Sequence, residues 1–174
     1  LACLIGCSLA IQSQNWTDVN SPISNDLNDV FFLDDQNGWI VGRQGKIIRT
    51  TDGGQTWTEQ NSGTTKDLTK IFMVDASTGY AVGDGGVFIR YNGTTWSVKN
   101  INFSQDMCGV FFLDADEGWI SGDWGRIMHT TDGGESWTNQ VTNAMYSNKF
   151  NDLYFLSSNE GWAVGTSGRV LKYN

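Results

Sequence analysis

The sequence has little of several residue types that particular protein classes need. A single histidine, His129, and three cysteines among 174 residues provide too few ligands for a zinc site and too few thiols for a disulfide framework. No apolar run reaches the ~20 residues that a membrane-spanning helix needs. The absences favour a protein without a metal centre, a cofactor, disulfides or a membrane span.

Positive charge is also scarce. Eleven lysines and arginines stand against nineteen acidic residues, which gives a net charge of −8. An acidic protein is poorly suited to phosphate backbones or anionic lipids, so we expect no nucleic-acid partner. Neither a phosphate-binding loop nor a Gly-x-Ser-x-Gly nucleophile motif occurs in the chain.

Glycine and aromatic residues are abundant instead, with 21 Gly, 8 Trp, 9 Phe and 5 Tyr, while proline occurs once, as Pro22. Such a composition favours short strands joined by tight turns. The length suits one domain with a real hydrophobic core.

The first residues differ in kind from the rest. The uncharged run LACLIGCSLAI resembles the apolar part of a secretory signal, which predicts a signal-peptide remnant over 1–13. Cleavage after Ala10 or Ser13 is one reading. Residues 4–7 also resemble a bacterial lipobox, in which Cys7 would carry a lipid anchor, and a short buried helix is a third reading. We expect a secreted, periplasmic or cell-surface bacterial protein.

Three sequence features repeat with one period of about 40 residues. The first is a tryptophan at steps of 41, 39 and 41: Trp16, Trp57, Trp96 and Trp137. The second is a glycine before an aromatic residue, at steps of 41, 39 and 43: Gly38, Gly79, Gly118 and Gly161. The third is an apolar tetrad with those same steps, beginning at Val30, Ile71, Val110 and Leu153. Such self-similarity indicates a repeat architecture.

Each repeat contains signals for four short antiparallel strands, which is typical of a β-propeller blade. The predicted fold class is therefore all-β, with blades at about 27–60, 68–99, 108–141 and 150–174, the last incomplete. A first outer strand is expected at 16–20, ahead of the first blade. It either completes the last blade of a four-bladed ring or, as we expect, belongs to a ring of six to eight blades of which this chain is a part.

Two octapeptides carry a resemblance to a known family. TTDGGQTW and TTDGGESW are similar to the Asp-box, or bacterial neuraminidase repeat, and the longer frame ending in each box resembles the repeat of photosystem II stability and assembly factor propellers. The matching positions are Thr50, Asp52, Gly54, Thr56 and Trp57, and Thr130, Asp132, Gly134, Ser136 and Trp137. A degenerate copy with Asn92 in place of the aspartate lies between them.

We expect the Asp-boxes to be structural. Aspartate closes a turn, glycine adopts positive φ, and tryptophan packs between sheets. Asp52 and Asp132 fall on different blades, so they do not form a catalytic pair. The arginine triad, Arg-Ile-Pro segment and Tyr-Glu pair that a sialidase resemblance would require are absent. No catalytic or metal-binding residue is expected.

Basic residues recur on the predicted third strands. One set has a base at the same position of every repeat: Arg49, Arg90, His129 and Lys172. A second set lies three residues earlier, with Val87 as the exception: Lys46, Arg126 and Arg169. In an acidic protein these rows are candidates for docking an acidic partner. Alternatively, they are solvent-facing residues that discourage edge pairing.

These observations predict a non-enzymatic, monomeric, secreted or surface-tethered scaffold that binds a protein or peptide. The family resemblance implies an arginine-rich face that holds a client polypeptide. Two alternatives stay open: a carbohydrate-active, sialidase-like propeller whose catalytic residues are absent from this chain, and a chaperone of photosystem II assembly.

Overall fold

The computed structural model describes residues 15–142 and 148–174. The expected signal-peptide remnant at 1–13 and the lipobox at 4–7 lie outside the described residues. Apart from three short 3-10 turns, all regular structure in the described part of the chain is β-strand. Within that part, no helix has the length and apolarity needed to cross a membrane.

The strands form four antiparallel sheets, which we call blades 1 to 4. Blade 1 contains β1 (Leu27–Phe32), β2 (Gly38–Gly42), β3 (Ile47–Thr50) and β4 (Thr58–Gln60). Blade 2 contains β5 (Leu68–Met73), β6 (Gly79–Gly83), β7 (Phe88–Tyr91) and β8 (Trp96–Lys99). Blade 3 contains β9 (Met107–Phe112), β10 (Gly118–Gly122), β11 (Ile127–Thr130) and β12 (Thr138–Asn139). Blade 4 contains β13 (Phe150–Ser157), β14 (Glu160–Gly165) and β15 (Val170–Tyr173).

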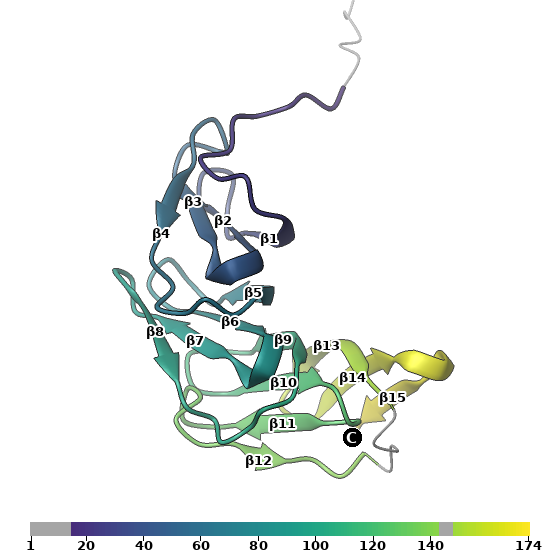
Figure 1. Ribbon diagram of the computed structural model, residues 1–174. Coiled ribbons are helices and arrows are strands. Elements are labelled where there is room, and N and C mark those ends of the chain that lie inside the picture. Colours follow the sequence, from purple (N-terminus) through teal and green to yellow (C-terminus); the bar gives the residue numbers. More distant parts are fainter. Residues whose placement is uncertain (1–14, 143–147) are drawn as a thin grey trace, which may run out of the picture.

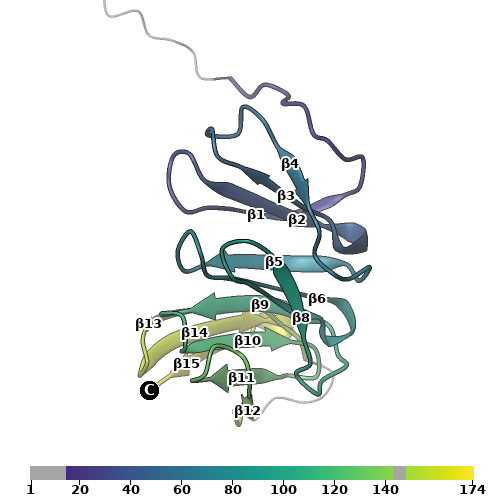
Figure 2. The same cartoon turned by 90° about the vertical axis from the view of Figure 1, so that its left-hand side faces the viewer.

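The blades follow one another along an open arc (Figure 1). Their first strands β1, β5, β9 and β13 contact one another in that order along the concave side. The last strands β4, β8 and β12 lie on the convex side, and Figure 2 shows blade 1 above blade 2, with blades 3 and 4 overlapping below them. Each sheet therefore presents one face to the preceding blade and one to the following blade.

The hydrophobic core is divided among the three gaps between blades. The cluster between blades 1 and 2 is built on Trp39, Ile47 and Trp96. The next gap is filled by residues such as Phe88 and Met107, and the third by Trp119, Phe150 and Phe155 among others. Because apolar burial is the main force that holds a sheet against its neighbour, each blade depends on the adjoining blades for stability.

The structure has no strand at the position 16–20, where the sequence predicts an outer strand. Residues 15–24 contain no strand, and Trp16 is fully exposed. The physical reason is the lack of a partner, because an outer strand must pair with the third strand of a blade. The segment lies before blade 1, where the described residues provide no such strand.

Candidate functional site

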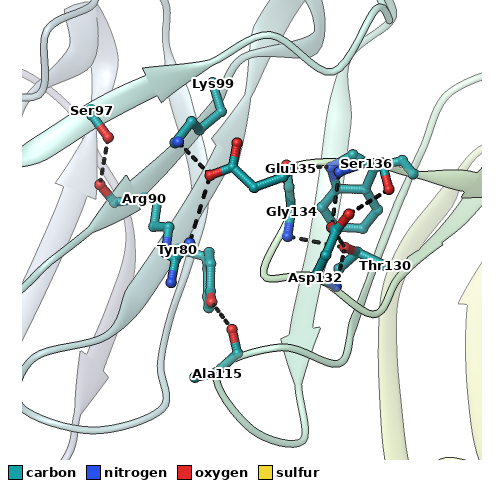
Figure 3. Close-up of polar contacts among 11 residues, drawn as sticks. Tyr80, Arg90, Ser97, Lys99, Ala115, Thr130, Asp132, Gly134, Glu135 and Ser136 are labelled. Carbon is teal, nitrogen blue, oxygen red and sulfur yellow. Dashed lines mark hydrogen bonds and ion pairs between the residues drawn. The ribbon is translucent and has the colours of Figure 1, made fainter.

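The two Asp-boxes are closed networks of hydrogen bonds. In the second box, the Thr130 hydroxyl donates to Asp132 Oδ1 at 2.8 Å and accepts from the Gly134 amide at 3.0 Å. Asp132 also accepts the amide of Ser136 at 2.9 Å and its hydroxyl at 2.5 Å. The first box repeats these bonds with Thr50, Asp52, Gly54 and Thr56. Figure 3 shows the second network, which uses the carboxylate oxygens to hold the turn.

These hydrogen bonds favour the ionised carboxylates. The side-chain hydrogen bond from Ser136, with the Ser136 amide, lowers the pKa of Asp132 to about 2. Thr56 acts in the same way and lowers the pKa of Asp52 to about 2. A general acid at neutral pH needs a raised pKa, so these carboxylates are suited to turn closure rather than to proton transfer.

The first basic row consists of Arg49, Arg90, His129 and Lys172. Each member pairs directly across from an aromatic residue of the second strand in its own blade: Trp39, Tyr80, Trp119 and Trp162, respectively. The Arg49 guanidinium lies 4.9 Å from the Trp39 ring centroid, and the His129 ring stacks on Trp119 at 4.4 Å. The row is therefore partly a set of cation–π and stacking contacts that cover the edges of the core.

Most members of this row also face a glutamate. Arg90 lies 3.8 Å and Lys99 lies 2.5 Å from Glu135 Oε1 in the Asp-box of blade 3 (Figure 3). His129 contacts Glu117 at 3.1 Å and Lys172 contacts Glu160 at 3.3 Å. Arg49 differs, because its guanidinium donates to the Tyr91 hydroxyl of blade 2 at 3.0 Å. The row is thus locally neutralised rather than a bare positive surface.

The second basic row consists of Lys46, Arg126 and Arg169. Each residue follows a 3-10 turn or tight turn and precedes the third strand, at the opposite end of that strand from the Asp-box. Lys46 pairs with Glu59 of β4 at 2.5 Å, and the Arg126 guanidinium lies 5.6 Å from the ring centroid of Phe103. The two rows lie toward opposite ends of the third strand.

The first strands carry a charge cluster that spans three blades. Lys70 of β5 lies 3.9 Å from Asp29 of β1 and 3.3 Å from Asp152 of β13. Gly109 of β9 occupies the equivalent repeat position in blade 3, and a Cβ atom there would lie 2.5 Å from Ser121 Oγ and 3.2 Å from Asp152 Cα. Burial raises the pKa of Asp29, although its hydrogen bond with the Ile71 amide and the Lys70 charge act in the opposite direction.

No metal-binding cluster is found over the described ranges, where no three His, Cys, Asp or Glu side chains gather. The hairpin carboxylates are engaged in turns: Asp34 and Asp114 each accept two backbone amides from the residues that follow. These bonds lower the pKa of both groups.

The sequence pattern predicts the strands on which the basic residues lie, but not the aromatic and acidic residues that they contact. The aromatic partners were visible as the repeating residue after Gly38 and its equivalents, yet the pairing depends on strand register. The Lys70 cluster had no sequence signal, because its members differ from blade to blade.

Comparison with known proteins agrees with this architecture. The profile of the family described as photosynthesis system II assembly factor YCF48 matches residues 9–90 and 63–144. A solved structure of YCF48 bound to D1 peptide has a TM-score of 0.68 at 16% identity and covers 95% of this chain and 68% of that chain. No curated protein sequence matches the chain.

Two further solved structures share the fold. YCF48 from Cyanidioschyzon merolae has a TM-score of 0.71 at 18% identity, covering 85% of this chain and 50% of that chain. An ancestral GH74 enzyme has a TM-score of 0.72 at 13% identity, covering 93% of this chain but 24% of the enzyme. The all-β propeller architecture expected from the repeats is confirmed.

Proposed function

Because the chain belongs to the family of photosynthesis system II assembly factor YCF48, we propose that it is a non-enzymatic propeller that binds a peptide segment of a protein client. The observation that carries the proposal is the family match, which extends over residues 9–144. The D1 peptide bound to a YCF48 structure of the same fold supports a peptide as the class of ligand.

We place the client on the first basic row, around Arg90. Its ion pair with Glu135 is long, at 3.8 Å, and the Glu135 side chain is 55% exposed. Exposed ion pairs contribute only about 0–1 kcal/mol, so a carboxylate of a client can replace Glu135 at little cost. Lys99 shares the same glutamate and provides a second cation at this place. An acidic or carboxylate-containing peptide fits this site better than a basic one.

A catalytic role has less support. The Asp-box carboxylates have a low pKa and are held by turn hydrogen bonds. The similarity to the GH74 enzyme is at 13% identity and concerns the fold alone. A peptide-binding scaffold is therefore better supported than a catalytic role.

We also propose that the protein is exported. The support is the uncharged apolar run of residues 1–11, which resembles a secretory signal. Fractionation of cells that express the chain tests this proposal. Recovery of the protein only in the cytoplasm contradicts it.

The binding proposal is tested with the D1 peptide as the probe. We expect the double variant Arg90→Gln, Lys99→Gln to bind it roughly fivefold more weakly, because two partly exposed ion pairs of about 0.5 kcal/mol each are lost. The matched control is Arg43→Gln, Lys66→Gln, which removes two positive charges elsewhere and is expected to bind like the unchanged protein. Affinities are measured by fluorescence anisotropy.

Two results would overturn the proposal. The first is no measurable binding of the peptide by the unchanged protein. The second is equal loss of affinity in both double variants, because that would show a general charge effect.

A further inference from the structure

The degenerate Asp-box of blade 2 has an asparagine where the two complete boxes have an aspartate. This asparagine, Asn92, is followed by Gly93, and the sequence contains one other Asn-Gly pair, Asn37–Gly38. The backbone nitrogen of a following glycine attacks an asparagine side chain more readily than that of any other residue, because glycine has no side chain to obstruct the approach. Both pairs therefore have the local sequence for loss of the side-chain amide, and their surroundings decide which one reacts.

The attacking nitrogen is held in the complete boxes but not in the degenerate one. The Gly53 amide donates to the Gln36 carbonyl at 3.0 Å, and the Gly133 amide donates to the Asp116 carbonyl at 2.9 Å. The box of blade 2 is one residue shorter, and within the described part of the chain the amide of Gly93 has no carbonyl partner. This nitrogen can therefore react without first giving up a hydrogen bond.

The side chain of Asn92 is oriented and polarised for this attack. Its Oδ1 atom accepts the amides of Thr94 at 3.0 Å and Thr95 at 2.9 Å. Because these donors lie two and three residues further along, the side chain folds back beside the intervening amide of Gly93. Donors on Oδ1 also stabilise the negative charge that develops on this oxygen when a nucleophile adds to the adjacent carbon atom, Cγ.

The leaving group of Asn92 is also available to solvent. The residue is exposed, and its Nδ2 atom has no hydrogen-bond partner in residues 15–142 and 148–174. Water can therefore reach this nitrogen and protonate it. The amide group can then depart as ammonia without breaking a contact with the protein.

The other Asn-Gly pair is protected at each of these points. The Nδ2 atom of Asn37 donates to both carboxylate oxygens of Asp34, at 3.1 and 3.0 Å. Gly38 is buried and pairs with Phe32 and Thr50 in the sheet of blade 1. Cyclisation at Asn37 must break these hydrogen bonds and distort the start of β2. The same dipeptide is thus protected in blade 1 and reactive in blade 2.

We propose that Asn92 is a self-modification site, at which the chain loses ammonia and gains the aspartate of a complete Asp-box. The Gly93 nitrogen forms a bond with Cγ of Asn92, the Cγ–Nδ2 bond breaks, and the proton of the Gly93 amide leaves with the ammonia. Water then opens the five-membered imide ring. Opening of the bond between Cγ and the Gly93 nitrogen gives aspartate, and opening of the other carbonyl–nitrogen bond gives isoaspartate.

The aspartate product supplies an acceptor that the degenerate box lacks. In the second complete box, the Ser136 hydroxyl donates to the second carboxylate oxygen of Asp132 at 2.5 Å. Asn92 has one acceptor oxygen, and the Thr95 hydroxyl lies 3.4 Å from it, at the limit of a hydrogen bond. A carboxylate at this position provides the second acceptor. The modification therefore strengthens the turn when it yields aspartate.

The site adjoins the first basic row. The Tyr91 hydroxyl donates to the Gly93 carbonyl at 2.8 Å and accepts from Arg49 at 3.0 Å. Arg49 is the member of this row without a carboxylate partner among the described residues. Deamidation adds a negative charge in the residue before Gly93, next to this chain of hydrogen bonds. The inference does not depend on the proposed peptide client.

The test compares the two Asn-Gly pairs in one protein. The purified chain is incubated at mildly alkaline pH and digested in heavy-oxygen water, which labels any deamidation that occurs during digestion, and the peptides are quantified by mass spectrometry. We expect Asn92 to react at least about tenfold faster than Asn37, the factor given by a barrier difference of about 1.4 kcal/mol. Equal rates, or a faster reaction at Asn37, overturn the proposal.

The chain unfolded in urea is the matched control for local sequence. Both asparagines precede glycine, so their rates are expected to converge once the box and the hairpin are lost. Asn37 should react faster in the unfolded chain than in the folded chain, because its protecting hydrogen bonds are gone. A tenfold difference between the two sites that persists in urea would assign the effect to local sequence and overturn the structural argument.

Two variants that carry the product test its effect on the fold. Asn92→Asp is expected to raise the Tm at pH 7 by about 2–4 °C, the shift that one added hydrogen bond gives in a chain of this size. Asn37→Asp is the matched control and is expected to lower the Tm, because its new carboxylate would face that of Asp34. A lower Tm for Asn92→Asp than for the unchanged chain contradicts completion of the box.

Discussion

At the scale of single residues, Gly54 and Gly134 occupy the same position in two different surroundings. Their φ angles are +84° and +85°. A Cβ atom on Gly134 would lie 2.5 Å from the Phe88 ring of blade 2, whereas on Gly54 the nearest atom would be 3.5 Å away, in Trp57 of the same box. The second Asp-box therefore also serves as a contact between blades.

This difference predicts unequal losses of stability. Gly54→Ala is expected to cost about 1–2 kcal/mol, from the positive φ alone. Gly134→Ala should cost about 1–3 kcal/mol more, because the added methyl group overpacks the gap against Phe88. Urea unfolding of both variants measures the difference, and equal losses would contradict the contact role of the second box.

The low pKa of Asp132 predicts a pH dependence. Its folded-state pKa of about 2 lies below the ordinary value of 3.8, so its contribution to stability is present above about pH 4 and is lost as the pH falls toward 2. We expect Asp132→Asn to have a lower Tm than the unchanged protein at pH 7, because asparagine provides one acceptor oxygen instead of two. The difference should shrink from pH 4 to pH 2, and a gap that stays constant would contradict the assignment.

At the scale of elements, aromatic rings link the first strands of successive blades. Phe31 and Phe72 lie 5.3 Å apart between ring centroids, Phe72 and Phe111 5.0 Å, and Phe111 and Tyr154 4.9 Å. These separations are typical of favourable aromatic pairs. The row connects blades whose backbones share no sheet.

Phe111 is the buried member that contacts rings of blades 2 and 4. Phe111→Ala is expected to lower the free energy of unfolding by about 3–5 kcal/mol, as is typical of a buried phenylalanine. Chemical denaturation measures this loss. A loss below about 1 kcal/mol would show that the aromatic row contributes little.

The repeat made the elements predictable because each blade must bury the same positions against its neighbours. The family resemblance and the propeller fold are confirmed on that basis. The strand expected at 16–20 stays a prediction, because strand formation depends on a partner sheet that the described residues do not provide. The partners of Arg49 and Arg90 depend on strand register and on the next blade, so the sequence placed the bases without showing what they contact.

At the scale of the whole molecule, the apolar core is divided among three clusters, one in each gap between successive blades. Because each cluster takes side chains from two blades, loss of one blade removes half of the core of the next, so neighbouring blades are expected to unfold together.

Lys70 shows that the four blades are not interchangeable. Its ammonium group contacts acidic residues of blades 1 and 4, and the first strand of the intervening blade 3 carries Gly109 at the equivalent position, where a Cβ atom would lie 3.2 Å from Asp152 Cα. Duplicating or exchanging a blade would place a side chain at the position of Gly109 or separate Lys70 from its acidic partners. Single residues of the first strands thus make contacts that depend on the order of the blades. A gene rearrangement that preserves the 40-residue period can still disrupt these contacts.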